Sequence, residues 1–305
     1  MVINYLKIVL SKLNEFILYR NKRENNLSEY RFKTETIKSA NFNPIFFLST
    51  GRTGTDFFTQ LLGKSDNVQV FHSPSNLFCN AQSELIEQGK IAYEMYKKYG
   101  FNDERTNKLT AQIFMAARED LLYKTYLHNK IYIETNNRIT FLAPAIKCIF
   151  PNAKFIHLYR HPGEFIRSGI RRRYYSSNSI HETGRLVPLK MTKYFSDWSN
   201  FDEIQKIAWL WSETNNFIGN FLETLNSDDY FNFNFNHLTT TNIENLLKFL
   251  QIEDIDSELI EKTINKPTNT QKAGFFPEYK EWNQDDKNKV IDLCEELNLK
   301  YGYEL

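Results

Sequence analysis

Five short apolar segments, separated by stretches with helical spacing, constrain the fold of this 305-residue chain most strongly. We expect strands at Ile45–Leu48, Val68–His72, Ile131–Glu134, Lys154–Tyr159 and Tyr230–Phe235. The first and fourth are nearly continuous apolar runs, as in parallel strands that are buried on both faces. The alternation of strands and helices predicts an α/β fold, a three-layer sandwich around a central, mostly parallel β-sheet.

The intervening stretches predict helices at about residues 56–62, 84–99, 107–129, 140–150, 163–174, 203–225 and 243–250. We expect one domain over residues 44–305 and an N-terminal helical extension over residues 1–43. Folds of this kind bind ligands at the carboxyl ends of their strands. Four of these ends carry the sequences STGRTGT, HSP, ETNN and RHP, so the functional site is expected there.

The net charge of the chain is only +1, although a quarter of its residues are charged. No overall electric field draws the protein to nucleic acid or membrane, so we expect no nucleic-acid partner and only a local anion site. Three cysteines, Cys79, Cys148 and Cys294, are widely spaced and show neither a zinc nor a disulfide pattern. This indicates a reducing compartment and predicts a cytoplasmic protein without a metal centre.

The first 20 residues have apolar side chains at helical spacing, interrupted by Lys7, Lys12 and Glu15. The stretch is too short and too charged for a membrane-spanning helix or the apolar core of a signal peptide. Two interpretations stay open. The helix packs on the domain through its apolar stripe, or it lies on a membrane surface and makes a peripheral contact.

The sequence STGRTGT after the first strand predicts an anion site. Gly51 and Gly54 allow a tight backbone, and a helix that starts after such a turn points free backbone N–H groups at one place. Arg52 adds a planar cationic fork that suits phosphate or sulfonate. The alternative is a tight strand–helix turn with a capping threonine and no ligand. Further hydroxyl groups come from Thr50, Thr53 and Thr55.

The loop of a nucleotide kinase or ATPase would carry Gly-Lys-Ser/Thr at the start of the helix. This chain has Gly54-Thr55-Asp56 at that point. Because the lysine is missing and an acidic side chain is present, the loop does not suit the β- and γ-phosphates of a magnesium nucleotide. An atypical P-loop kinase is therefore the least favoured of the functions that we consider.

A second anion site is predicted after the fourth strand, in the sequence PNAKFIHLYRHPGEFIRSG. Arg160 closes a buried apolar strand, where a guanidinium needs a partner. The sequence His161-Pro162-Gly163 then turns the chain into a helix that carries Ser168. The turn brings the start of this helix beside the end of the strand, so we expect Arg160 and Ser168 to converge on one oxyanion.

Together, these two segments resemble the sulfotransferase family. STGRTGTDFF is similar to the family's loop for the 5′-phosphosulfate, and Arg-x-Pro with a serine eight residues after the arginine is similar to its 3′-phosphate-binding segment. Two further stretches, residues 233–252 and NKPTNTQKAGFFPEYKEW with the later YGY, resemble other parts of the family. The resemblance covers about residues 44–303 and implies a P-loop-like sulfotransferase fold.

The resemblance implies an enzyme that transfers a sulfuryl group from 3′-phosphoadenosine 5′-phosphosulfate (PAPS) to a hydroxyl or amine of a carbohydrate or similar acceptor. Arg160 and Ser168 would hold the 3′-phosphate. Arg52 would also stabilise charge on the leaving oxygen, and no metal is needed in principle. The residues implied to hold the 5′-phosphosulfate are Gly51, Arg52, Thr53, Gly54, Thr55 and, through its backbone N–H, Asp56.

The sequence does not identify which residue acts as the general base. Many carbohydrate-type members of the family have Glu-Pro after the second strand, whereas this chain has Ser73 in place of that glutamate. His72 is adjacent, and histidine is a common general base in enzymes, so it is the first candidate. Glu134, at the end of the third strand, is the second. Lys266 or Lys272 is the candidate cation for the leaving oxygen.

A second interpretation is a degenerate family member that binds the nucleotide, or an anionic glycan, without transfer. The serine in place of the glutamate and the acidic Asp56 motivate it. The acceptor itself is not specified by any motif. It would contact the segments around residues 75–101 and 172–201, whose Tyr, Arg and Asn content suits a sugar or an acidic glycan and equally a solvated surface.

Overall fold

The fold is built on a five-stranded sheet. A computed structural model describes residues 33–38, 42–72, 81–176, 185–266 and 275–303, with the backbone alone for residues 81–86. The strand order is β2-β3-β1-β4-β5, and every neighbouring pair is parallel. The predicted parallel sheet is confirmed. The strands are β1 (Ile45–Leu48), β2 (Val68–Phe71), β3 (Ile131–Glu134), β4 (Lys154–Tyr159) and β5 (Tyr230–Asn234).

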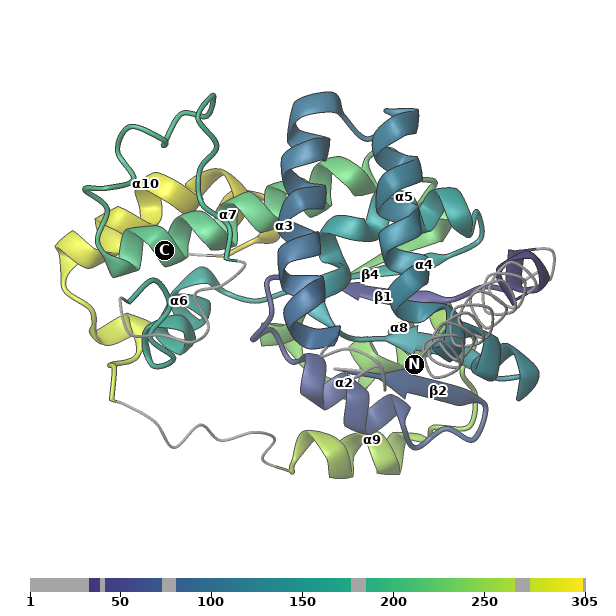
Figure 1. Cartoon of the computed structure of the whole chain (residues 1–305). Coiled ribbons are helices and arrows are strands. Elements are labelled where there is room, and N and C mark those ends of the chain that lie inside the picture. The colour runs from purple at the N-terminus through teal and green to yellow at the C-terminus, as the bar shows by residue number, and fades with distance from the viewer. Residues whose placement is uncertain (1–32, 39–41, 73–80, 177–184, 267–274, 304–305) are drawn as a thin grey trace, which may run out of the picture.

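Helices cover both faces of this sheet and complete the three-layer sandwich. One face packs on α2 (Thr55–Leu62), α8 (Thr240–Leu250) and α9 (Ser257–Ile264). In Figure 1, α7 (Glu203–Leu222) and α10 (Gln284–Tyr301) lie side by side at the upper left, away from α2 and α9 at the bottom. The other face packs on α3 (Ala81–Tyr99), α4 (Glu104–Leu127), α5 (Ala143–Ile149), α6 (Pro162–Ile170), α7 (Glu203–Leu222) and α10 (Gln284–Tyr301).

The central strand β1 shows why its sequence is a continuous apolar run. Phe46 and Leu48 belong to the core under α4 and α7, whereas Ile45 and Phe47 belong to the core under α2 and α8. Successive side chains of a strand point to opposite faces, so a strand with helices on both sides needs an apolar residue at each position. All four side chains are at most 3% exposed.

Some predicted elements differ from the structure. The single helix expected at residues 140–150 is a 3₁₀ turn, η1 (Asn137–Leu142), followed by α5, because Pro144 lies in the first turn of α5 and has no N–H to donate to a preceding helix. Helices α9 and α10 were not predicted. Their sequences are largely polar, and α10 buries only a narrow stripe against α7.

Most of the predicted N-terminal extension, residues 1–32, lies outside the described residues. Residues 33–38 are helical, and Ile37 is fully buried in the core. Lys33 Nζ contacts Asp120 Oδ1 on α4 at 2.9 Å, so this short piece packs on the domain. Among the described residues, no helix combines the length and apolar character that crossing a membrane requires.

Candidate functional site

The loop between β1 and α2 adopts a backbone that few residue types allow. Gly51, Arg52 and Gly54 have φ angles of 77°, 57° and 96°, all in the left-handed region. A Cβ atom at Gly54 would lie 2.0 Å from the ring of Phe235, so only glycine fits there. Because α2 begins at Thr55, its first N–H groups, which have no partner within the helix, are directed to the concave side of the loop.

The two predicted anion-binding segments meet in the structure. Arg52 Nε donates to Ser168 Oγ at 3.4 Å, and Arg160 Nη1 donates to the carbonyl oxygen of Arg52 at 3.5 Å. Arg160 also forms an ion pair with Glu164, which lies one turn into α6. The carboxyl ends of the adjacent strands β1 and β4 thus place two guanidinium groups and a hydroxyl close together.

These residues line a cavity of about 870 Å³. Burial, and then repulsion from Arg172, lower the pKa of the Arg52 guanidinium. On the other side of the cavity, His161 lies between two tyrosine rings, with centroid distances of 4.9 Å to Tyr279 and 5.2 Å to Tyr303. We did not single out these tyrosines from the sequence, although FPEYKEW and YGY, which contain them, belong to the stretch that resembled the family's tail.

One atom of the loop lacks the partner that burial demands. The Thr53 hydroxyl is fully buried and has no hydrogen-bond partner among the described residues. An unpaired buried hydroxyl costs free energy, but Thr53 does not line the large cavity, so this atom is not a contact for a ligand there. Arg52, Gly54 and Thr55 do line the cavity, and a guanidinium beside the start of a helix fits an anionic group such as the 5′-phosphosulfate of PAPS.

The Asp56 carboxylate pairs with the His72 side chain. Asp56 Oδ1 lies 2.7 Å from His72 Nε2, and His72 Nδ1 lies 3.0 Å from Thr135 Oγ1. Thr135 Oγ1 in turn lies 2.7 Å from Thr59 Oγ1 on α2. Asp56 is 30% and His72 33% exposed, so the pair is accessible, and Asp56 lines the large cavity. The sequence had suggested these two residues separately but gave no sign that they form a pair.

Glu134 does not reach this site, and we withdraw it as a candidate base. Its carboxylate accepts from Arg118 Nε at 2.9 and 3.0 Å, from Arg118 Nη2 at 2.8 Å and from the Tyr132 hydroxyl at 2.8 Å. The side chains of Glu134 and Arg118 are both 0% exposed. A general base must lie within reach of the proton that it removes, and this carboxylate is enclosed in the core.

A model of the sulfotransferase family matches residues 44–253, which is more than half of the chain. The chain belongs to this family. The sulfotransferase STF9 from Mycobacterium avium has a similar fold, with a TM-score of 0.51 at 12% identity over 87% of this chain and 78% of that one. A sulfotransferase domain from the curacin biosynthetic pathway aligns over 87% of this chain and 99% of its own, with a TM-score of 0.49 at 15% identity. A search of curated proteins returned no match.

Of the two lysines suggested as a cation for the leaving oxygen of a sulfotransferase reaction, only Lys266 is described by the structure. Lys266 is exposed after the end of α9 and does not line the large cavity, and Lys272 lies outside the described residues. Lys280, which we did not predict, lines the cavity instead. Within the described ranges, no three His, Cys, Asp or Glu side chains are grouped as a metal would require.

Proposed function

We propose that this chain is a PAPS-dependent sulfotransferase that modifies a hydroxyl, or an amine, of a carbohydrate or similar acceptor. The observation that carries the proposal is the convergence of Arg52, Arg160 and Ser168 on one cavity, beside the start of α2. A kinase would need a lysine at the start of α2, where Thr55 and Asp56 stand.

Two anchor points would hold the nucleotide. The N–H groups at the start of α2, together with the side chain of Arg52, bind the 5′-phosphosulfate, and the backbone of Gly51, Thr53, Gly54, Thr55 and Asp56 shapes this cradle. Arg160 and Ser168, at the end of β4 and on α6, bind the 3′-phosphate. The distance between the two phosphates then selects a 3′-phosphorylated nucleotide over a simple nucleoside monophosphate.

PAPS, when bound, supplies the sulfuryl group, and the acceptor oxygen displaces the nucleotide in line. Negative charge grows on the oxygen that bridges the sulfuryl group and the 5′-phosphate. The Arg52 guanidinium and the N–H groups of the loop stabilise that charge without having to reorganise, because the backbone already holds them in place. Arg52 therefore has a catalytic role as well as a binding role.

The acceptor must also lose a proton during transfer. We assign this step to the Asp56–His72 pair, in which Asp56 faces the cavity and His72 is held between Asp56 and Thr135. The 2.7 Å contact between Asp56 Oδ1 and His72 Nε2 already holds one proton, so the proton of the acceptor goes to the second carboxylate oxygen of Asp56. The pair replaces the glutamate that related enzymes carry at the position of Ser73.

Transfer of ³⁵S from labelled PAPS to a panel of carbohydrate and other hydroxyl acceptors tests this proposal. We expect transfer to at least one class of acceptor and its loss in the Arg52→Gln variant. The degenerate alternative predicts binding of 3′-phosphoadenosine 5′-phosphate without transfer to any acceptor. Absence of both binding and transfer would refute the two functions together.

We propose a cytoplasmic location, which rests on the spacing of the cysteines. Contact of residues 1–20 with a membrane surface is the alternative to packing of this helix on the domain, and it lies outside the described residues. Binding of the full-length chain to vesicles with anionic lipids, compared with a chain that lacks residues 1–20, separates the two.

A further inference from the structure

A second, smaller cavity lies on the other side of the phosphosulfate loop. Its volume is about 60 Å³, and its walls come from Ser49 and Thr50 after β1, from Asn137 and Arg138 after β3, from α3 and from Arg185. Three cationic side chains line it, those of Lys90, Arg138 and Arg185, and no carboxylate is among the described residues that do so.

The sheet order places this cavity on the opposite side of β1 from the large cavity. β1 lies at the centre, with β4 and β5 on one side and β3 and β2 on the other. The large cavity is formed beyond β4 and β5, around Arg160 and Phe235. The small cavity is formed beyond β1 and β3, and Asn137 Nδ2 lies 3.0 Å from where a Cβ of Gly51 would stand. The small cavity therefore borders the loop after β1, and the residues that line it are not those that line the large cavity.

Among the described residues that line this cavity, no carboxylate offsets the charge of its cations. Burial, and then repulsion from Arg185, lower the pKa of the Arg138 guanidinium, and no carboxylate acts to raise it. The Arg185 guanidinium lies 3.2 Å from the ring centre of Tyr174, and its Nε is buried without a hydrogen-bond partner among the described residues. Two half-buried guanidinium groups in one small space are costly unless an anion joins them.

We propose that Arg138 and Arg185 bind an acidic group of the acceptor, a carboxylate or a sulfate or phosphate ester, while the hydroxyl to be modified faces the loop. This inference rests on the proposed function. The cavity has room for about four water-sized groups, which matches one small oxyanion. Planar guanidinium groups bind such oxyanions in a bidentate manner, and Lys90 adds a point charge at the rim.

Matched acceptor pairs test the inference on the intact enzyme. In ³⁵S transfer from PAPS, we expect kcat/KM for 4-nitrophenyl β-glucuronide to exceed that for 4-nitrophenyl β-glucoside by about 10- to 100-fold, the usual worth of a hydrogen bond to a charged group. The Arg138→Gln and Arg185→Gln variants should each reduce this preference while leaving binding of 3′-phosphoadenosine 5′-phosphate unchanged. Equal use of the two glycosides by the wild type would overturn the inference.

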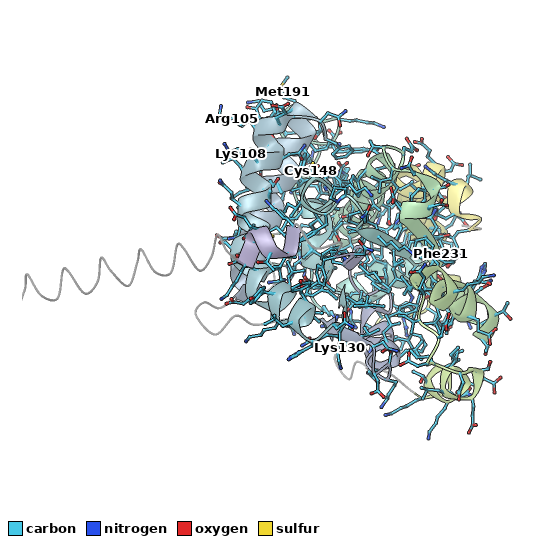
Figure 2. The ribbon with its side chains drawn as sticks, turned by 90° about the vertical axis from the view of Figure 1, so that its right-hand side faces the viewer. Arg105, Lys108, Lys130, Cys148, Met191 and Phe231 are labelled. Atoms are coloured by element: carbon cyan, nitrogen blue, oxygen red, sulfur yellow. The ribbon has the colours of Figure 1, made fainter. Side chains whose placement is uncertain are left out.

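Arg105→Gln is the matched control, because Arg105 is exposed near the start of α4 at the edge of the molecule (Figure 2). It removes the same charge and should retain the full preference for the acidic acceptor. Arg138→Lys keeps the positive charge but lacks the planar guanidinium group. It should retain part of the preference for the glucuronide even where Arg138→Gln folds poorly. An unchanged preference in both Arg138 variants and in Arg185→Gln would contradict the assignment.

A second measurement does not depend on transfer. Crystals grown with 3′-phosphoadenosine 5′-phosphate and soaked in selenate should show a selenium peak between Arg138 and Arg185, and this peak should be lost in Arg138→Gln. Selenate bound elsewhere but not here would refute the subsite. If selenate occupies this cavity but PAPS reacts with no acceptor, the proposed function is refuted and the anion subsite is retained.

Discussion

Replacing Glu134 with glutamine separates a structural role of this carboxylate from a chemical one. Arg118 and Glu134 are 0% exposed and share three contacts of 2.8–3.0 Å. Glutamine keeps the shape but leaves the Arg118 charge buried without a counter-charge. Breaking a buried pair in this way costs about 3–5 kcal/mol, a large part of the roughly 5–15 kcal/mol by which a typical protein is stable.

Urea unfolding followed by circular dichroism measures this loss for Glu134→Gln. A double variant, Arg118→Met with Glu134→Leu, removes both charges and should recover most of the stability. Below its unfolding transition, Glu134→Gln should transfer sulfuryl groups within about threefold of the wild-type rate, since the carboxylate does not reach the site. Wild-type stability combined with a collapse of kcat would instead restore Glu134 as the base.

Three further predictions follow from individual contacts. Arg160→Gln should weaken binding of 3′-phosphoadenosine 5′-phosphate about 10- to 100-fold, and binding of adenosine 5′-phosphosulfate far less; equal losses in calorimetry would show that Arg160 does not contact the 3′-phosphate. His72→Gln should lower kcat by about 10²- to 10⁴-fold with the donor Kd unchanged, and an unchanged kcat would remove the Asp56–His72 pair from the chemistry. Burial lowers the pKa of His157 from 6.5 to about 4. As the pH falls, the imidazole is therefore protonated in the unfolded chain before it is protonated in the folded one. The free energy of unfolding should then fall by about 3 kcal/mol between pH 7 and pH 4. His157→Gln should flatten that pH profile, and identical profiles in denaturant titrations would contradict the assignment.

The strands and the loop could be predicted because their sequences are constrained locally. A strand buried on both faces needs an apolar residue at every position, which marked β1 and β4. The left-handed φ angles at positions 51 and 54 favour glycine, so the two glycines in the sequence indicated a tight loop at this point. Arg160 and Ser168 both line the large cavity, and their convergence on one oxyanion stays a prediction.

The remaining contacts depend on how distant elements pack. Glu134 ends a strand at the same edge as the site, but the alternation of β3 points it with Tyr132 towards α4, where Arg118 is buried. Arginine in a helix is usually exposed, so nothing in the sequence marked Arg118 as its partner. The Asp56–His72 pair likewise arises only once α2 packs beside β2.

The central claim is that the loop after β1 and the segment after β4 form a two-point clamp for a phosphosulfate nucleotide. Calorimetry of the wild-type protein with 3′-phosphoadenosine 5′-phosphate and, separately, with ATP and Mg²⁺ tests it most directly. The clamp predicts binding of the former with at least tenfold higher affinity, since only that ligand has a phosphate for Arg160. Tighter binding of ATP with Mg²⁺ would contradict the claim.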